Sequence, residues 1–594
     1  MEVVWAGIWE SNLTGANLVA SKVSLFLAEL KRRKVYRVAT VYVVAGAGII
    51  GLCEAALPSN LWEGIQIPVG VIILVGLPIA LILGWAYEVR PEEQRSSDPS
   101  DKEASPTPHA ATPTTIPTTG HRKSIVVLPF DNMSPDPGDA YFSDGLTEEI
   151  IANLSHLGSL RVISRSSAMV LKGTQKDVRT IGRELDVQYV LEGSVRKAGD
   201  ALRITAQLID ADSDEHLWAE HYEGKLDDVF KIQEDTSRAI VDALHVKINP
   251  DELKKLVERP IDDVRAYERY LRARSELHLA TEESIENARR HLEAGLGIVG
   301  ENGLLYQGMA ELHLCSHDFG VKADDETLQQ AEEFAARVVA LRPNSATIHY
   351  LKGRIERLRG TVPAAAQHFE KALEIDPNHP DALVWLVFAY CAQFGRPSAA
   401  DTYSERLAKI DPLSPLSMFG VGFHHLVSGR LEEALSTFNG LLALEPDFLI
   451  ASIQGQALSL MWQDRHEEAL EVLAPIAHRE PRDHLTDYAV FLQRAIAGDS
   501  VGVKTALSED TRNWFWNDPE LPWFGASAFA LAGAKDEALT WLERAVEQGW
   551  INHPLFSERD PLLESIRDEP RFKELMVGVK RDWEAFGARL KSTS

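Results

Sequence analysis

Residues 353–377 read GRIERLRGTVPAAAQHFEKALEIDP, a stretch that decides the fold of the second half of the chain. Small residues on two successive helices let the helices approach closely, an aromatic residue fills the gap between them, and a proline stops the second helix. In this stretch those positions are Gly353, Ala365, Phe369, Ala372 and Pro377. The stretch therefore predicts a helical hairpin.

The same pattern recurs at a regular interval. Prolines stand 34 or 35 residues apart, at Pro343, Pro377, Pro412, Pro446 and Pro481. Counting back from the last two gives the equivalent small and aromatic positions, Gly422, Ala434, Phe438, Ala457 and Ala469. The pattern resembles the tetratricopeptide repeat, in which such hairpins stack into a superhelix. The resemblance implies an all-α superhelix over residues 250–580, including a carboxyl-terminal cap, and a tail at residues 581–594.

The predicted repeat region is the candidate binding surface of the chain. Stacked repeats present a long concave groove, which usually holds a peptide or a helix of a partner protein. The 88 acidic side chains outnumber the 61 basic ones, so charge complementarity favours a partner segment that carries basic residues. The same balance argues against broad nucleic-acid binding, which needs clustered Lys and Arg. The alternative is an array that acts only as a spacer.

The amino-terminal part contains two long apolar stretches. Residues 35–57 read VYRVATVYVVAGAGIIGLCEAAL, and residues 65–87 read IQIPVGVIILVGLPIALILGWAY. Each is longer than the roughly 20 residues that a helix needs to cross a bilayer. Basic residues flank the pair on its outer sides, at Lys31, Arg32, Arg33, Lys34, Arg37, Arg90 and Arg95. By the positive-inside rule the sequence predicts a cytosolic leader (1–34), a two-helix transmembrane hairpin (35–87) and a cytoplasmic location for the bulk of the chain.

The alternative to this hairpin is a cleavable signal peptide. The segment before the first apolar stretch has more than 30 residues, which is too long for an ordinary n-region. The chain has 3 cysteines, far apart in sequence, which fits a reducing compartment. The predicted location is therefore the bacterial inner (cytoplasmic) membrane, with two spans.

Between the apolar stretches and the repeats, the sequence predicts a linker and an α/β domain. Residues 88–121 are rich in Pro, Ser and Thr, and such a segment is typical of a flexible linker. From residue 122 to 249, strand and helix patterns alternate. The predicted strands cover 124–130, 160–164, 189–195, 201–209 and 216–222, and the predicted helices cover 146–154, 178–185 and 226–244. Ser143 or Asp144 is expected to cap the first helix.

Several successive motifs in this domain carry a family resemblance. They are SIVVLPFDNMSPDPGDAYFSDGLTEEI (124–150), RVISRSSAMVLKG (161–173) and DDVFKIQ (227–233). The motifs resemble the TolB-like amino-terminal domain found in bacterial cyclase-like and winged-helix membrane regulators that carry tetratricopeptide repeats. The resemblance implies an accessory domain without an established active site. The short leader lacks the room for the cyclase or DNA-binding effector domain of those regulators.

Few residues offer a catalytic or metal-binding constellation. The P-loop pattern and the G-x-S-x-G elbow are absent from the sequence. One cluster combines metal-ligand types, at His313, Cys315, His317 and Asp318. These residues would split over two faces of a helix, so an ordinary packed helix is favoured over a metal site.

Two groups of aspartates are candidate ligand sites. Asp210, Asp212 and Asp214 mimic the start of a calcium loop, but its sixth and twelfth positions are Glu215 and His221, so a charged hairpin turn is favoured. The other group crowds the loop after the first strand, at Asp131, Asp136, Asp139 and Asp144. Ligands usually bind at this end of a strand in an α/β sheet. The acidic loop is unsuited to phosphate, and a turn-forming loop is the alternative.

The sequence therefore predicts a multidomain chain with a transmembrane α-hairpin, an α/β TolB-like domain and a repeat superhelix. Its predicted function is that of a non-catalytic, membrane-anchored scaffold that binds protein partners in the repeat groove, without a cofactor or metal. The lipid bilayer and a second copy of the chain are further expected partners. The alternative is a signalling regulator whose TolB-like domain binds a small molecule or nucleotide.

Overall fold

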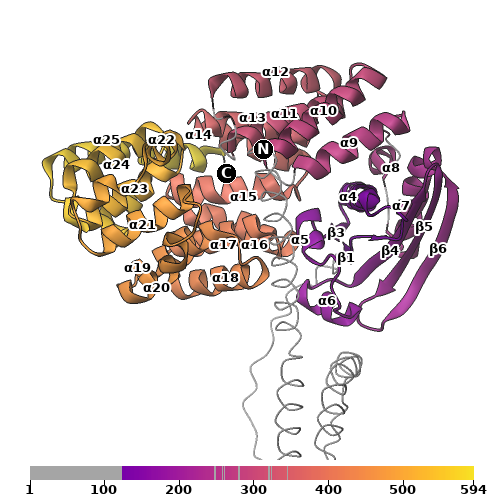
Figure 1. The fold of residues 1–594 in the computed structure, drawn as a ribbon, viewed down its shortest axis with the longest axis horizontal. Helices are drawn as coiled ribbons and strands as arrows, with labels where there is room; N and C mark the ends of the chain where they lie inside the picture. The colour runs from indigo at the N-terminus through magenta and orange to yellow at the C-terminus, as the bar shows by residue number, and fades with distance from the viewer. Residues whose placement is uncertain are drawn as a thin grey trace, which may run out of the picture. The chain divides into compact units, whose positions relative to one another are not determined.

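The computed structural model describes residues 123–593, apart from 247–248, 257–258, 260, 278–280, 319–321, 323 and 344. These residues belong to one compact unit, Pro117–Ser594. The unit combines a small α/β region with a larger helical superhelix (Figure 1).

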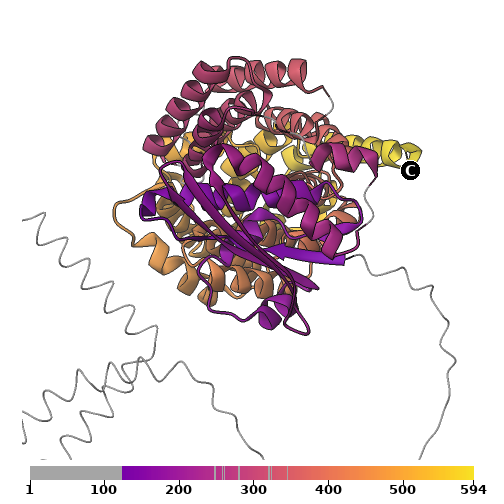
Figure 2. The same cartoon turned by 90° about the vertical axis from the view of Figure 1, so that its right-hand side faces the viewer.

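A 6-stranded sheet forms the α/β region, with the order β3-β1-β4-β5-β6 and β2 paired beside β4. Its strands are β1 (Lys123–Val127), β2 (Asp131–Asn132), β3 (Leu160–Val162), β4 (Tyr189–Ala198), β5 (Ala201–Asp210) and β6 (Glu215–Lys225). β1 runs parallel to β3 and β4, whereas β4, β5 and β6 are antiparallel, which confirms the predicted pairing of the 189–195 and 201–209 segments. Figure 2 shows the long strands facing the viewer.

The helices of this region are α4 (Ala140–Ser155), α5 (Arg165–Val170), α6 (Val178–Glu184) and α7 (Val229–Ala243), with the 3-10 turns η1 (Pro137–Asp139) and η2 (Leu226–Asp228). The expected cap of α4 is wrong. The helix begins at Ala140, so Ser143 lies inside it and its hydroxyl donates to the Ala140 carbonyl at 3.0 Å. Asp144 also lies inside α4, where it pairs with Lys172 at 2.6 Å.

In β5 and the second half of β4, one face of the sheet is apolar and the other polar, whereas β1 is buried on both faces. In β5 the side chains of Leu202, Ile204 and Leu208 are buried, whereas Thr205 and Gln207 alternate with them on the opposite face. Helices α4 and α7 contact the sheet. This alternation is what a half-covered sheet requires, and it leaves the polar face available for binding.

The core of the α/β region continues into the first repeat helices. Buried residues of the sheet, α4 and α7 form one cluster with Tyr267, Leu271 and Leu305. A β-carbon on Gly145 of α4 would lie 2.6 Å from Leu271, so the two helices approach closely there. The Tyr141 hydroxyl donates to Glu268 at 2.8 Å. The α/β region is therefore packed as part of the superhelix.

The superhelix is built from successive helical hairpins. After α8 (Pro250–Leu256) its helices are α9 (Val264–Leu277), α10 (Glu282–Val299), α11 (Gly303–Asp318), α12 (Asp325–Leu341), α13 (Ala346–Leu358), α14 (Val362–Ile375), α15 (Pro380–Phe388), α16 (Pro397–Ile410), α17 (Pro415–Val427), α18 (Leu431–Leu444), α19 (Leu458–Met461), α20 (His466–Ala477), α21 (His484–Ile496), α22 (Glu509–Asn517), α23 (Leu521–Leu531), α24 (Lys535–Glu547) and α25 (Pro570–Thr593). Shorter turns are the π-helical η3 (Ala389–Gln393), η4 (Ala451–Ala457) and η6 (Leu555–Arg559) and the 3-10 turns η5 (Gly502–Thr505) and η7 (Pro561–Ile566).

The repeat-signature residues lie at the helix contacts. A β-carbon on Gly353 would lie 2.5 Å from the Phe369 ring, and one on Gly422 would lie 2.8 Å from the Phe438 ring. The remaining small signature residues are buried, at Ala365, Ala372, Ala434, Ala457 and Ala469. The prolines Pro377 and Pro446 follow the ends of α14 and α18, and Pro481 follows α20. Small residues thus admit the aromatic rings between paired helices.

The carboxyl-terminal hairpins pack back onto earlier repeats. The Ile551 amide donates to the Gln393 carbonyl at 3.0 Å, and the Phe394 and Phe586 rings lie 4.3 Å apart. The Phe423 ring also meets Trp523, at 6.1 Å. One continuous core joins these segments. Part of the surface that an open array would offer to a partner is therefore covered by the chain itself.

The predicted fold class needs correction in its membrane part. Within residues 123–593, as far as they are described, no helix combines the length and apolar character needed to cross a bilayer. The predicted leader, both predicted spans and the linker (1–121) lie outside the described residues. The fold class is corrected to a mostly helical chain with a small α/β region and a repeat superhelix. The inner-membrane location is accordingly not retained.

Candidate functional site

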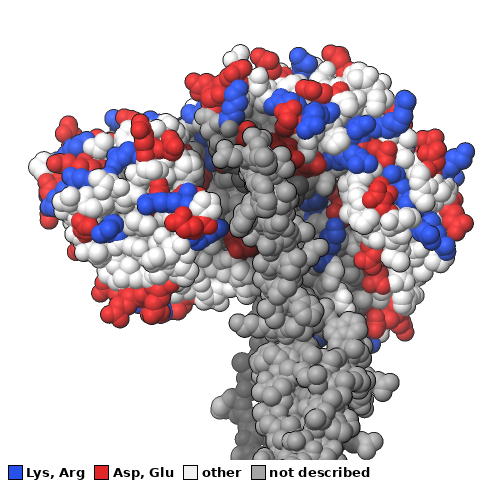
Figure 3. Space-filling model, viewed as in Figure 1, with Lys and Arg blue, Asp and Glu red and all other residues white. Residues whose placement is uncertain are grey.

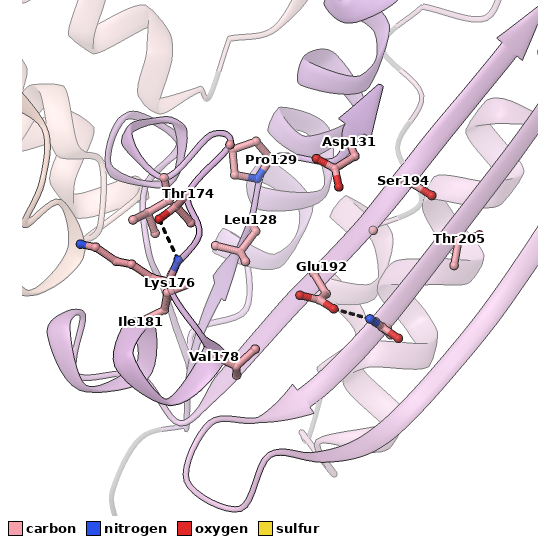
Figure 4. A pocket seen from close by; sticks show the side chains of 14 residues that line it. Leu128, Pro129, Asp131, Thr174, Lys176, Val178, Ile181, Glu192, Ser194 and Thr205 are labelled. Carbon is pink, nitrogen blue, oxygen red and sulfur yellow. Dashed lines mark hydrogen bonds between the residues drawn. The ribbon is translucent and has the colours of Figure 1, made fainter. Parts of the chain in front are cut away.

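A cleft of about 330 Å³ opens on the polar face of the sheet, next to the carboxyl end of β1 (Figure 4). Strands β4 and β5 supply a polar floor, and the segment from the end of α5 into α6 supplies a wall. The lining residues are Leu128, Pro129, Asp131, Leu171, Gly173, Thr174, Lys176, Val178, Ile181, Glu192, Gly193, Ser194, Thr205 and Gln207. The cleft lies where α/β sheets commonly bind ligands.

The polar groups of the cleft are arranged around one carboxylate. The Gln207 side-chain amide donates to one oxygen of Glu192. Asp131 lies at the rim (Figure 4). Among the described lining residues Lys176 is the one cation, and its ammonium pairs with Glu184 at 2.6 Å. Figure 4 shows that ammonium pointing away from Glu192. The cleft therefore carries a negative electrostatic character.

The four aspartates predicted after the first strand do not converge. Asp131 lines the cleft. Asp136 accepts from the Gly138 amide at 2.8 Å and caps η1. Asp139 pairs with Lys197 at 3.1 Å, and Asp144 pairs with Lys172. Only one of the four thus belongs to the cleft, whereas Glu192 and Gln207 were missed because they sit in an ordinary strand alternation.

A second arrangement joins the α/β region to the repeats, and we name it the Asp411 latch. The Asp411 side chain is buried, and its Oδ1 accepts from the Ser167 amide at 3.2 Å, from the Ser167 hydroxyl at 2.7 Å and from the Ser164 hydroxyl. Its Oδ2 accepts from the Ser417 hydroxyl at 2.5 Å. The Ser164 amide also donates to the Ile410 carbonyl at 2.8 Å. A repeat turn is thereby fixed to the start of α5.

Helix α5 connects the latch to the cleft. Its first turn, at Ser164 and Ser167, contacts Asp411. The residues that follow its end, Leu171 and Gly173, line the cleft. A short helix thus touches the repeats at one end and the cleft at the other. The sequence patterns predict no helix over Arg165–Val170, although Ser164 is a recognisable N-cap that accepts from the Ser167 amide.

A third feature is a group of charged side chains contributed by several helices, which we name the charged cluster. It comprises Glu148 and Glu149 (α4), Arg274 (α9), Glu311 and Asp318 (α11), Arg354 and Arg357 (α13), Asp381 (α15), and Asp518 and Glu520 before α23. Arg274 pairs with Glu148 at 2.6 Å and with Glu311, and Arg357 pairs with Asp318 at 3.0 Å and with Glu520 at 3.4 Å. Carboxylates outnumber guanidinium groups in this cluster.

The excess of carboxylates over arginines, together with burial, raises the pKa of several carboxyl groups in the cluster. Burial, reinforced by the neighbouring Glu148 charge, raises the pKa of Glu149 to about 7. Burial likewise raises the pKa of Glu520 to about 7 and shifts the pKa of Asp381 and Asp518 upward. These carboxylates lack enough positive charge around them to offset desolvation. An added cation would lower their pKa values and stabilise their charged forms.

Glu149→Gln is expected to stabilise the protein selectively at alkaline pH. The folded state binds a proton at Glu149 more tightly than the unfolded chain does, so stability from this group is present at low pH and is lost as the pH rises through about 7. Glutamine keeps the neutral form at every pH. The free energy of unfolding of the variant should therefore exceed that of the wild type by about 1–2 kcal/mol at pH 8 and by little at pH 5, after allowance for partial exposure. Melting temperatures from pH 5 to 8 check this, and parallel curves for the two proteins would contradict it.

The other predicted ligand groups serve packing and turn formation. The His313 ring is buried and stacks on Phe334 at 5.7 Å, and burial lowers its pKa to about 4. Asp318, which is close in sequence, instead pairs with Arg354 and Arg357. Asp210 accepts from the Ser213 amide at 3.0 Å in the β5–β6 turn. Among the described residues no group of three or more His, Cys, Asp or Glu side chains is placed to hold a metal ion.

The distribution of charge over the surface is mixed. In the view of Figure 3, basic and acidic side chains are interspersed over the described surface. A nucleic-acid-binding surface would instead gather Lys and Arg on one face.

Comparisons with known families match the two regions separately. Residues 121–240 match the family described as "HilA/YgeH-like transcriptional regulator, second domain". Residues 326–380 and 357–417 match tetratricopeptide-repeat families. The chain thus carries tetratricopeptide repeats. These matches do not support the predicted resemblance of the α/β region to TolB-like domains.

Curated proteins match shorter parts of the chain. It is 43% identical over 209 residues to "Putative adenylate cyclase 3" of Rhizobium meliloti (strain 1021), which is 35% of each chain. It is 35% identical over 81 residues to "Probable biofilm formation methyltransferase WspC" of Pseudomonas putida, which is 14% of this chain and 19% of that protein. The chain therefore spans about a third or less of the length of these relatives.

Solved structures resemble the repeat fold. YrrB, titled a TPR protein with an unusual peptide-binding site, is 21% identical with a TM-score of 0.25, over 33% of this chain and 96% of that one. PilW, a type IV pilus biogenesis factor, is 19% identical with a TM-score of 0.28, over 36% of this chain and 96% of that one. The comparisons therefore show that the chain carries tetratricopeptide repeats. They also show that about one third of the chain is similar to a protein named as an adenylate cyclase.

Proposed function

We propose that this protein is a non-catalytic scaffold that holds a basic segment of a partner protein against its charged cluster. Tetratricopeptide repeats commonly bind protein partners, and this supports a scaffold role for the superhelix. The charged cluster is the main observation behind the proposal. It contains seven carboxylates and three arginines from α4, α9, α11, α13, α15 and the turn before α23. The partner's lysines or arginines would supply the positive charge that the cluster lacks.

The surroundings of the cluster suit a segment that also carries apolar residues. The half-buried Trp385 ring lies 4.0 Å from the Arg357 guanidinium, and Tyr350 lies beside Arg354. Half-buried carboxylates form stronger charge-assisted hydrogen bonds than fully hydrated ones, because the local dielectric is lower. A basic amphipathic helix would satisfy both the carboxylates and the rings.

The names of the relatives bear on the setting of this role. One relative is named as an adenylate cyclase, and the family over residues 121–240 is that of a transcriptional regulator. Both names belong to signalling proteins, and we propose a scaffold within a signalling assembly. The non-catalytic assignment is tested by incubating the purified protein with ATP and magnesium and measuring cyclic AMP. Formation of cyclic AMP would refute it.

The binding proposal is tested with designed peptides. A fluorescent amphipathic helix of Lys and Leu should bind the protein, and the same helix with Glu in place of Lys should not, as measured by fluorescence anisotropy. The double variant Asp381→Asn/Glu520→Gln should weaken binding about tenfold, a change of about 1.4 kcal/mol. The matched control is Glu432→Gln/Glu433→Gln, which removes the same charge from the exposed first turn of α18. Equal weakening by both double variants would show that binding reflects net charge alone.

A further inference from the structure

The cleft on the sheet is a binding site of a different kind from the charged cluster. We propose that it binds a small aliphatic amine or guanidine at Glu192, and that the Asp411 latch positions the wall of this site. The cleft has a volume of about 330 Å³, at the lower end of the range of small-molecule sites. A ligand of this size fits the cleft, whereas a folded partner does not.

The charge of the cleft selects a cation. Asp131 and Glu192 are its acidic groups, and the ammonium of Lys176 is already paired with Glu184 and points away (Figure 4). A phosphate or a carboxylate would meet two like charges here and no free basic group among the described lining residues. An ammonium or guanidinium can instead donate to Glu192, because Gln207 engages one of its oxygens and the other faces the cleft without a protein donor among the described residues.

The remaining lining narrows the class of cation. Half-buried Leu128, Pro129 and Val178 form an apolar wall beside the floor, and this wall suits a short methylene chain. The described lining contains no aromatic ring, whereas quaternary ammonium ions are held in aromatic cages. Hydroxyl and amide groups at Ser194 and Gln207 can accept further N–H donors. A primary amine or a guanidine with a short alkyl chain meets all of these conditions.

The latch gives the site a mechanical link to the repeats. Asp411 holds Ser164 and Ser167 at the start of α5, and the residues after the end of α5 form part of the cleft wall. Because α5 is one short helix, a change at its first turn displaces the segment containing Leu171 and Gly173. Asp411 is therefore a positioning residue for the site, and it lies in a repeat turn.

The test is isothermal titration calorimetry of the intact chain with agmatine and with putrescine at low ionic strength. Binding of either amine, with no binding of succinate or n-butanol, is expected. Glu192→Gln should weaken binding at least tenfold, whereas Glu223→Gln, an equal charge change on exposed β6, should leave it unchanged. Failure of both amines to bind at millimolar concentration, or equal affinity in Glu192→Gln, would overturn the proposal.

Two further variants separate the parts of the inference. Asp411→Asn, which keeps the side-chain size, should weaken amine binding three- to tenfold, and an unchanged affinity would remove the positioning role. The Asp381→Asn/Glu520→Gln variant should bind agmatine as the wild type does. A loss of agmatine binding in that variant would place the amine at the charged cluster and overturn the assignment to the cleft, whatever the outcome of the peptide experiment.

Discussion

Asp411→Ala is expected to lower the free energy of unfolding by about 2–4 kcal/mol. The buried carboxylate accepts from one backbone amide and three hydroxyl groups, contributed by Ser164, Ser167 and Ser417. Alanine leaves the three hydroxyl groups without this acceptor, whereas the Ser167 amide keeps the Ser164 hydroxyl as a partner. A buried donor without an acceptor costs its full desolvation penalty. Urea denaturation measures the total loss. Hydrogen exchange should show faster exchange at residues 163–171 and 410–417 than elsewhere.

The matched control for Asp411 is Glu445, the acidic residue at the same position of the following repeat. Glu445 is exposed and precedes Pro446 as Asp411 precedes Pro412. Glu445→Ala should change the unfolding free energy by no more than about 0.5 kcal/mol, as surface substitutions usually do. A similar loss in both variants would mean that the acid stabilises the repeat turn itself and that the latch contributes little.

Phe438→Ala is expected to cost about 3–5 kcal/mol, the range for a buried phenylalanine in a core that cannot collapse around the gap. The Phe438 side chain is 0% exposed. Its ring packs against Phe419 at 5.7 Å and against the backbone of α17 and η4, where Gly422 and Gly455 face it. Thermal or urea unfolding of the purified variant measures the loss. A cost under about 1 kcal/mol would show that the hairpins repack freely.

A double-mutant cycle tests the reason for the small residue opposite this ring. A β-carbon on Gly422 would lie 2.8 Å from the Phe438 ring, so Gly422→Ala should cost about 1–3 kcal/mol in the wild type through overpacking. In the Phe438→Ala background the same change should be close to neutral, because the added methyl group fills the space that the ring has left. Additive losses would show that the two residues are not coupled.

The architecture of the described residues was largely predictable, because it rests on local signals. The spacing of Gly353, Phe369 and Pro377 encodes a hairpin, since each residue type has one geometric role in it. Alternation of Leu202, Ile204 and Leu208 with polar residues encodes a half-covered strand. These signals lie close together in the sequence, so they can be recognised without knowledge of tertiary contacts.

The sites were less predictable, because they depend on contacts between distant segments. Asp411 resembles Asp376, Glu445 and Glu480 in the repeat pattern, and only the folded chain shows that it alone among them is buried. Glu192 lies on the polar side of β4, where a polar residue is expected in any strand with one solvated face, so the sequence does not mark it as a site residue. The charged cluster draws on residues from Glu148 to Glu520, and no short motif records that convergence.

The shared core of the α/β region and the first repeats has a consequence for protein synthesis. When the ribosome has delivered the last strand, which ends at Lys225, the residues that complete this core, Tyr267, Leu271 and Leu305, have not yet been translated. The surfaces of α4 and α7 that pack against these helices, at Gly145 and Phe230, therefore stay uncovered until the first hairpins emerge. The latch cannot form until Asp411 has also been translated. Ribosome-attached chains that stop before residue 305 should need a chaperone to remain unaggregated.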